Sequence, residues 1–156
     1  VSAEDIREIE DWKEARYREL VNGNVKVFPG VMPLLKVMNA GGFKVALGTS
    51  APLENVHAIA ADIGLDEYFS AVVHGREVSE GKPSPEIYLT AAERLEVDPA
   101  NCIVFEDSPH GVEAARLAGM KCVAVTNSHP AEELSAANRV VQSLEEIDLI
   151  QLIRWI

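Results

Sequence analysis

The feature that most constrains this chain is a regular alternation of short apolar runs and helix-like segments after residue 42. The apolar runs are strand-sized and lie at residues 43–47, 71–73, 102–105, 121–125 and 139–141. Helical patterns separate or follow them at residues 53–63, 84–95, 109–119, 130–137 and 145–153. Short, continuously apolar strands are typical of sheets that are buried on both faces. The pattern therefore predicts an α/β fold, a three-layer Rossmann-like parallel sheet with helices on both sides.

Two further helical segments precede the first apolar run. Residues 3–20 carry apolar side chains at helical spacing, with Ser2 placed to cap the helix and an Asn-Gly-Asn stop at residues 22–24. Residues 31–39 form a second, shorter helical pattern that ends at Gly41. No internal repeat or low-complexity segment interrupts the chain.

Composition narrows the classes of protein that this chain can belong to. The 156 residues suffice for one domain with a real core, and 25 acidic against 14 basic residues give a net charge of −11. The basic residues are not clustered on one face, so we do not expect this protein to bind nucleic acid. No apolar run approaches the roughly 18 to 20 residues that span a bilayer. The two cysteines are not spaced as in a zinc site, and the chain shows no signal peptide. We therefore expect the protein to be located in the cytoplasm.

Ligands of parallel sheets bind at the carboxyl ends of the strands, so the residues directly after each run are the informative ones. Gly48, Thr49 and Ser50 follow the first run. The glycine allows a tight turn, and the two hydroxyls together with the N–H groups of the next helix can cradle a phosphate. The alternative is that Ser50 only caps that helix.

A lysine and two carboxylates follow later runs. Lys82 lies in the turn Gly81–Pro85, where its ammonium can neutralise a phosphate or can simply face solvent. Glu106 and Asp107 end the run at 102–105, and two adjacent carboxylates there favour a hard cation such as Mg²⁺. Ser108 can cap the following helix, so that neither carboxylate is needed as a cap. Hydroxyls, lysine, carboxylates and metal on one sheet edge together indicate phosphoryl transfer.

Three ordered motifs resemble the haloacid dehalogenase superfamily, in particular its β-phosphoglucomutase-like phosphatases. They are Lys44–Ser50, Gly81–Tyr88 and Val104–Ala115, and the similarity extends from about Tyr17 to the C-terminus. The resemblance implies a core domain at residues 23–156 and the last part of a helical cap domain at residues 1–22.

The resemblance also implies roles for single residues. Thr49, with Ser50 beside it, resembles the phosphate-binding hydroxyl, and Lys82 resembles the lysine that holds the phosphate and offsets the charge of the nucleophile. Asp107 resembles the direct Mg²⁺ ligand, and Glu106 resembles its acidic neighbour, which often reaches the metal through water. Mg²⁺ is the implied cofactor.

One family motif is missing from this chain. The family's leading strand carries an Asp-x-Asp pair, in which the first Asp is the nucleophile and the second the general acid/base. No Asp-x-Asp occurs in the 156 residues. In the family this strand lies in the middle of the sheet, so the resemblance implies a fold that is incomplete between the strands at 43–47 and 102–105. Three explanations follow. The sequence is part of a longer enzyme, a second chain or swapped protomer supplies the strand, or the two flanking strands pair directly in an inactive domain.

The sequence therefore predicts a Mg²⁺-dependent phosphatase or phosphoglucomutase-like enzyme whose aspartate nucleophile lies outside this chain. Its substrate is expected to be a small phosphorylated metabolite such as a sugar phosphate, with no nucleic-acid or membrane partner. The alternative is a non-catalytic protein that retains a phosphate and Mg²⁺ site and acts by binding or assembly. An unrelated nucleotide-binding domain is disfavoured, because neither a G-x-G-x-x-G nor a P-loop motif is present. We interpret the four scattered histidines as non-ligands: His57, His74, His110 and His129.

Overall fold

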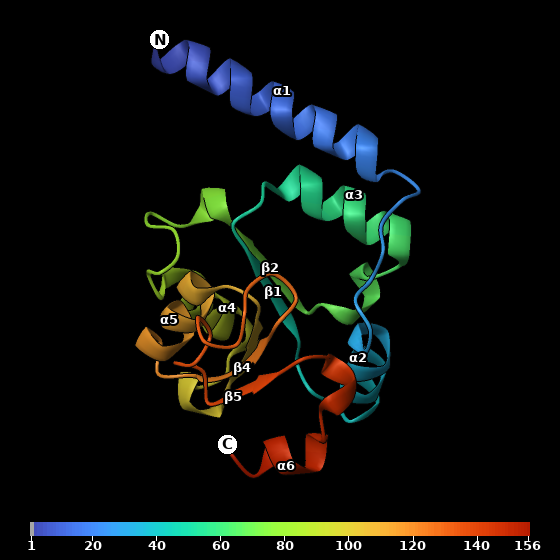
Figure 1. Ribbon diagram of the computed structural model, residues 1–156, viewed down its shortest axis with the longest axis vertical. Helices are drawn as coiled ribbons and strands as arrows, with labels where there is room; N and C mark the ends of the chain where they lie inside the picture. The colour runs from blue at the N-terminus through green and yellow to red at the C-terminus, as the bar shows by residue number, and fades with distance from the viewer. Residues whose placement is uncertain (1) are drawn as a thin grey trace.

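The computed structural model describes residues 2–156 (Figure 1). The helices are α1 (Ala3–Val21), α2 (Val31–Ala40), α3 (Leu53–Ile63), α4 (Glu86–Leu95), α5 (Pro109–Leu117) and α6 (Leu149–Ile153). The strands are β1 (Ala46–Thr49), β2 (Ala71–His74), β3 (Ile103–Glu106), β4 (Lys121–Val125) and β5 (Arg139–Val141). Short 3₁₀ turns lie at Asp66–Tyr68, Gly75–Glu77, Pro99–Asn101 and Leu144–Glu146.

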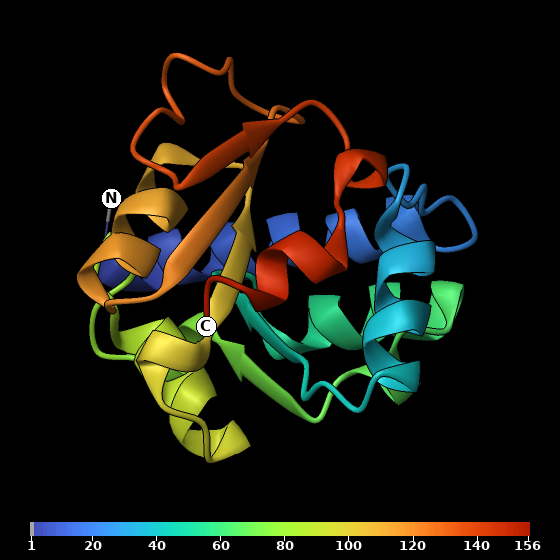
Figure 2. The same ribbon diagram turned by 90° about the horizontal axis from the view of Figure 1, so that it is seen from below.

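All strand pairs are parallel, as predicted, but the strands form two sheets. β1 pairs with β2, with Ala46 opposite Ala71, and the second sheet has the order β3-β4-β5. Within residues 2–156, β1 and β3 do not pair with each other, so the two sheets of the domain are separate in their hydrogen bonding (Figure 2). The α/β class is therefore confirmed, whereas direct pairing of the two flanking strands is not found. β1 and β3 are the strands between which the family's leading strand was expected.

The second sheet is buried on both faces, which explains its apolar sequence. In β4, the side chains of Cys122 and Ala124 pack into one core cluster with α4 and α5. The alternate residues Val123 and Val125 pack into another cluster with Leu152 of α6. Because successive side chains of a strand point to opposite faces, one short strand contributes to both cores. Helices thus cover this sheet on its two sides, as the periodicity predicts.

Helix α1 lies across α3 on one side of the molecule (Figure 1). The predicted cap is confirmed, because the Asp5 backbone N–H donates to the Ser2 hydroxyl at 3.1 Å. The contact between α1 and α3 is polar: Asn55, only 3% exposed, accepts from Arg18 at 2.9 Å and donates to Glu14 at 2.5 Å. Most of the large apolar side chains of α1 remain exposed: Ile6, Ile9, Trp12, Tyr17 and Leu20. The assignment of residues 1–22 to a separate domain stays a prediction.

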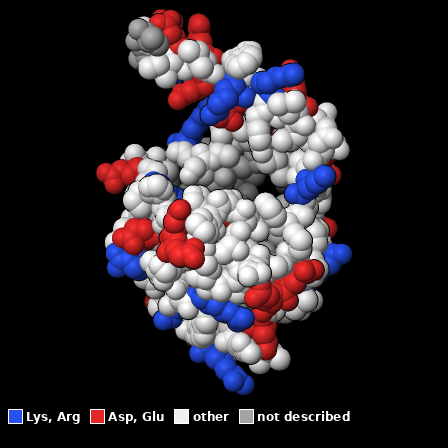
Figure 3. Space-filling model, in the orientation of Figure 1, with Lys and Arg blue, Asp and Glu red and all other residues white. Residues whose placement is uncertain are grey.

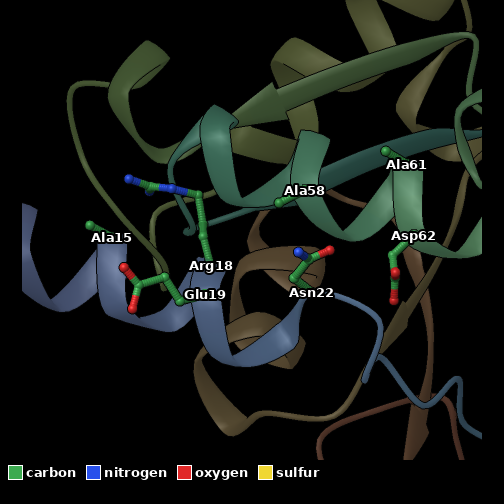
Figure 4. A pocket seen from close by; sticks show the side chains of 7 residues that line it. All are labelled: Ala15, Arg18, Glu19, Asn22, Ala58, Ala61 and Asp62. Carbon is green, nitrogen blue, oxygen red and sulfur yellow. The ribbon is translucent and has the colours of Figure 1, made fainter.

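A groove of about 580 Å³ separates the C-terminal half of α1 from α3 (Figure 4). Its lining includes Arg18, Asn22 and Asp62 but none of the five predicted site residues. The Asp62 carboxylate accepts from the backbone N–H groups of Gly23 at 2.9 Å and Val25 at 3.3 Å. It thereby fastens the segment that leaves α1 to the side of α3.

Two helix predictions near the C-terminus need correction. Residues 130–137 do not form an α-helix; they form successive turns, with Leu134 N–H bonded to the Ala131 carbonyl and Ala137 N–H to the Leu134 carbonyl. The predicted helix at 145–153 is divided, because Asp148 caps the new helix α6 by accepting from the Ile150 N–H at 2.9 Å.

The described part of the surface shows no large cluster of basic side chains on the face that Figure 3 presents, as the sequence predicts. On the face shown in Figure 3, Lys and Arg side chains are scattered among Asp and Glu side chains. Among the described residues, no helix is both long and apolar enough to cross a membrane.

Candidate functional site

Lys82 connects the carboxyl ends of β1 and β3, which are edge strands of the two sheets and do not pair with each other. Its Nζ donates to the carbonyl oxygen of Gly48, near the end of β1, at 3.4 Å and forms an ion pair with Oε1 of Glu106, the last residue of β3. The Lys82 and Glu106 side chains are only 13% and 7% exposed. The structure therefore brings together the lysine and the acidic motif that the sequence predicts at one edge.

Both oxygens of the Glu106 carboxylate accept hydrogen bonds from neighbouring donors. Oε1 accepts from Lys82 and from the hydroxyl of Tyr88 on α4. Oε2 accepts from the Ser108 hydroxyl at 2.9 Å, the Asp107 N–H at 3.0 Å and the Ser108 N–H at 3.2 Å. A buried carboxylate is costly unless it is paired and hydrogen-bonded, and this set of donors meets that requirement.

The electrostatics of the cluster follow from these contacts. Burial acts to raise the pKa of Glu106, but the Lys82 ammonium and the hydrogen bonds from Tyr88 and Ser108 outweigh it, so the pKa is lowered. Burial, together with the adjacent Glu106 carboxylate, raises the pKa of Tyr88. Lys82 also lies 4.8 Å from the centre of the Tyr88 ring, within cation–π range. Glu106 is therefore ionised at neutral pH, and Tyr88 is a neutral donor.

Because Gly111 has no side chain, the Glu106 carboxylate can lie directly against its backbone. A Cβ at this position would lie 1.9 Å from Cδ of Glu106, far inside the contact limit. Gly111 belongs to α5, whose N-cap is Ser108, with its hydroxyl accepting from the Gly111 N–H at 3.1 Å. The cap predicted for Ser108 is confirmed.

Asp107 is held by the loop that follows β4. The Ser128 hydroxyl donates to Asp107 Oδ2 at 2.5 Å, and Nδ1 of His129 lies 3.0 Å from the Asp107 carbonyl oxygen. The ring of His129 thus contacts the backbone of Asp107 and not its carboxylate. Asp107 stands beside Glu106 in the chain, but its carboxylate has different partners.

The two predicted hydroxyls stand directly after Gly48. The Thr49 hydroxyl accepts from the Ala51 N–H at 3.1 Å, and the Ser50 side chain is exposed. Ser50 does not cap α3, whose N-cap is Pro52. Because Lys82 contacts the Gly48 carbonyl, Thr49 and Ser50 lie at the same strand end as the ammonium group.

The residues present fit a metal ion only in part. A carboxylate oxygen suits Mg²⁺, and Asp107 offers one at the strand edge. Glu106 would have to release Lys82, Tyr88 or Ser108 to bind a metal directly. Across residues 2–156, no group of three His, Cys, Asp or Glu side chains is placed to hold a metal. The metal roles of Asp107 and Glu106 therefore stay predictions.

Sequence reasoning assigned no role to three residues of this site: Tyr88, Ser128 and His129. Tyr88 is the last residue of the motif Gly81–Tyr88 and lies in the first turn of the helix that follows Lys82. This position could have indicated a side chain close to the lysine. Ser128 and His129 follow β4, so their place after a strand of the parallel sheet was the available signal.

Comparisons with known proteins place this chain among hydrolases. A family model described as haloacid dehalogenase-like hydrolase matches residues 1–119. The chain is 35% identical, over 94% of its length and 39% of the relative, to the chloroplastic 5-amino-6-(5-phospho-D-ribitylamino)uracil phosphatase of Arabidopsis thaliana. It spans between 34% and 48% of the length of the first three curated relatives, so it corresponds to less than half of each.

Solved structures agree with the family model. The crystal structure of β-phosphoglucomutase from Clostridium difficile has a TM-score of 0.88 and 27% identity, covering 99% of this chain and 68% of that one. A CbbY mutant from Rhodobacter sphaeroides, in complex with xylulose-(1,5)bisphosphate, has a TM-score of 0.85 and 32% identity, with 90% and 65% covered. The matched model covers most of the chain, and the resemblance carried by the three motifs is confirmed. This chain belongs to the haloacid dehalogenase-like hydrolase family.

Proposed function

We propose that the protein carrying this chain is a phosphatase or phosphomutase for a small phosphorylated metabolite, and that this chain supplies its phosphate-holding half. The observation that carries the proposal is the buried Lys82–Glu106 pair at the strand edge, beside the hydroxyls of Thr49 and Ser50. An ammonium held by protein groups needs little reorganisation when it neutralises an incoming phosphate. A sugar or sugar-alcohol phosphate is the favoured substrate class, because two relatives are named as phosphatases of phosphorylated carbohydrates and of a phosphoribitylamino compound, and a CbbY structure holds xylulose-(1,5)bisphosphate.

Within this proposal, each residue has a separate task. Thr49 and Ser50 donate hydrogen bonds to phosphate oxygens, and Lys82 offsets their charge. Asp107 provides a carboxylate oxygen to Mg²⁺, which when bound would withdraw charge from the phosphoryl group. Glu106 holds Lys82, and any contact that it makes with the metal would run through water.

The nucleophile must come from outside residues 1–156, because no Asp-x-Asp occurs among them. We assign it to a strand that enters between β1 and β3, since Lys82 reaches both strand ends. The intact mass of the purified protein under denaturing conditions separates two sources. A mass well above that of residues 1–156 alone supports a strand in the same polypeptide. An equal mass leaves either a second chain that supplies the strand or a non-catalytic binding function.

The activity is tested by phosphate release from p-nitrophenyl phosphate and from a panel of sugar phosphates, with Mg²⁺ and after its removal by EDTA. Lys82→Ala and Asp107→Ala are each expected to lower kcat/KM by about a hundredfold or more. Near-normal turnover in either variant removes that residue from the proposed site.

A non-catalytic binding function is the second candidate, and the missing Asp-x-Asp pair is the observation that favours it. It predicts that the protein binds inorganic phosphate through Lys82 yet releases none from any ester, with or without Mg²⁺.

A further inference from the structure

The segment that carries Lys82 has little structure of its own. Residues 78–85 connect the 3₁₀ turn Gly75–Glu77 to α4 without a helix or strand. One turn bond, from the Ser84 N–H to the Gly81 carbonyl at 3.0 Å, spans the lysine. An irregular loop of this kind is normally mobile, and such motion would disturb the geometry of the buried ion pair between Lys82 and Glu106.

Glu86, the first residue of α4, ties this loop together. Its two carboxylate oxygens accept from the Ser79 N–H at 3.0 and 2.9 Å, and Oε2 also accepts from the Ser79 hydroxyl at 2.7 Å and the Glu80 N–H at 3.0 Å. These donors lie on the far side of Lys82 in sequence. The hydrogen bonds of Ser79 lead among the causes that lower the pKa of Glu86, so its carboxylate stays charged well below neutral pH.

The helix that carries Glu86 is anchored in the core. Glu86 is followed directly by Ile87 and Tyr88, which are 2% and 7% exposed in the core cluster. A carboxylate in the first turn of a helix is also stabilised by the helix dipole. Glu86 therefore closes an eight-residue loop, Ser79–Glu86, whose base is fixed to the core and whose middle presents Lys82 to Glu106.

We infer that Glu86 is a positioning residue, which holds Lys82 at the strand edge by clamping the backbone of Ser79 and Glu80. This inference rests on the proposed function for its consequence in phosphate binding, but its geometric part stands alone. Glu86 touches neither the substrate site nor Glu106; it acts through the loop.

The test measures how accessible Lys82 is, separately from catalysis. Purified protein is acylated with a trace of acetic anhydride, and the labelling rate of each lysine is read by peptide mass spectrometry. In Glu86→Ala we expect Lys82 to react about tenfold faster, the equivalent of one charge-assisted hydrogen bond, while the exposed Lys36 serves as internal reference. Glu93→Ala, an exposed glutamate of the same helix, is the matched control and should leave the Lys82 rate unchanged.

Two further variants guard against general unfolding. Ser79→Ala removes one exposed hydroxyl and should raise the Lys82 rate in the same direction but less, whereas Glu86→Asp keeps the charge and should restore part of the protection. An unchanged Lys82 rate in Glu86→Ala overturns the inference, as does an equal rise at Lys36, which would mean that the whole fold had loosened.

The affinity for inorganic phosphate, measured by calorimetry, distinguishes this inference from the proposed function. Both Glu86→Ala and Lys82→Ala are expected to weaken phosphate binding about tenfold or more. If Lys82 becomes accessible in Glu86→Ala while Lys82→Ala binds phosphate normally, the clamp is supported and the phosphate role of Lys82 fails.

Discussion

Replacing Gly111 by alanine tests whether the Glu106 cluster is as tightly packed as the structure indicates. A Cβ at residue 111 would lie 1.9 Å from Cδ and 2.1 and 2.2 Å from the carboxylate oxygens of Glu106. These contacts are with the head of a side chain that five hydrogen bonds hold in place, so the carboxylate cannot move aside without losing them. Gly111→Ala is therefore expected to act as a disruption of the ion pair and not as a mild helix substitution.

The magnitude follows from the contacts that are lost. Inserting a group into a packed interior costs typically about 1 to 3 kcal/mol, and breaking a buried ion pair about 3 to 5 kcal/mol. Relaxation of α5 offsets part of this cost, so we expect the free energy of unfolding to fall by about 3 kcal/mol. For a chain of this size the melting temperature should drop by about 6 to 12 °C.

A double-mutant cycle with Glu106→Ala gives a sharper result, because the sign of the effect should reverse. Without the Glu106 carboxylate the clash is gone, and alanine is a better helix residue than glycine by up to about 1 kcal/mol. Gly111→Ala should therefore stabilise the Glu106→Ala protein while destabilising the wild type. Gly81→Ala, where a Cβ meets no atom within 4 Å, is the stability control.

The assay is urea unfolding at pH 7, followed by far-ultraviolet circular dichroism for all four members of the cycle and the control. A loss of about 3 kcal/mol in both backgrounds would falsify the reasoning, since the cost would then not come from Glu106. A wild-type loss below about 0.5 kcal/mol would show that the carboxylate has room to move.

Three further predictions concern charged and polar groups elsewhere. Lys82→Met leaves the Glu106 carboxylate buried without its cation, so the free energy of unfolding at pH 7 should fall by about 3 kcal/mol. This loss should be partly recovered as the pH is lowered toward 5, whereas the wild type should lose stability in acid because the pKa of Glu106 is lowered in its folded state. Urea unfolding at both pH values checks this. Asn55→Ala removes both hydrogen bonds that fix α1 to α3, so trypsin should cleave within α1 several-fold faster than in wild type, with the core product intact; an unchanged rate would show that other contacts hold the helix. The hydrogen bond from Arg94, with a smaller contribution from the His74 N–H, lowers the pKa of Glu77 to about 2. Carboxyl NMR should therefore find Glu77 ionised down to that pH, and its titration should move to higher pH in Arg94→Met while staying below the usual range, because the His74 hydrogen bond remains; an unchanged titration would contradict the role of Arg94.

The strand ends could be predicted from the sequence because their signals are local. Short apolar runs mark buried parallel strands, and the predicted residues Gly48–Ser50 and Glu106–Ser108 do lie at the carboxyl ends of β1 and β3, where Lys82 reaches both strands. The ion pair between Lys82 and Glu106 could not be deduced, because nothing in the spacing distinguishes a lysine aimed at a substrate from one aimed at a neighbouring carboxylate. The partners of Glu106 come from α4, the Lys82 loop and its own chain neighbours, and only the fold brings them together.

The errors have the same origin. Residues 130–137 have helical composition after a proline, but the structure gives them turns, with Leu134 fully buried against the core. Local propensity is a weak prior, and the need to place one side chain can override it. The role of Glu86 could not be predicted from its motif, Gly81–Tyr88, because its three donors belong to Ser79 and Glu80, which lie outside that motif.

The separation of the two sheets has a consequence for solvent exchange of the backbone. In a parallel sheet, alternate N–H groups of a strand point to opposite neighbours, so an interior strand is protected along its whole length and an edge strand only at every second residue. β1 and β3 are central in the chain yet are edges of their sheets. Deuterium should therefore enter their amides in an alternating pattern, while β4, paired on both sides, exchanges slowly throughout. If a strand does fill the space between β1 and β3, the fast set in both strands should become slow together, which gives a residue-level reading of when the sheet is complete.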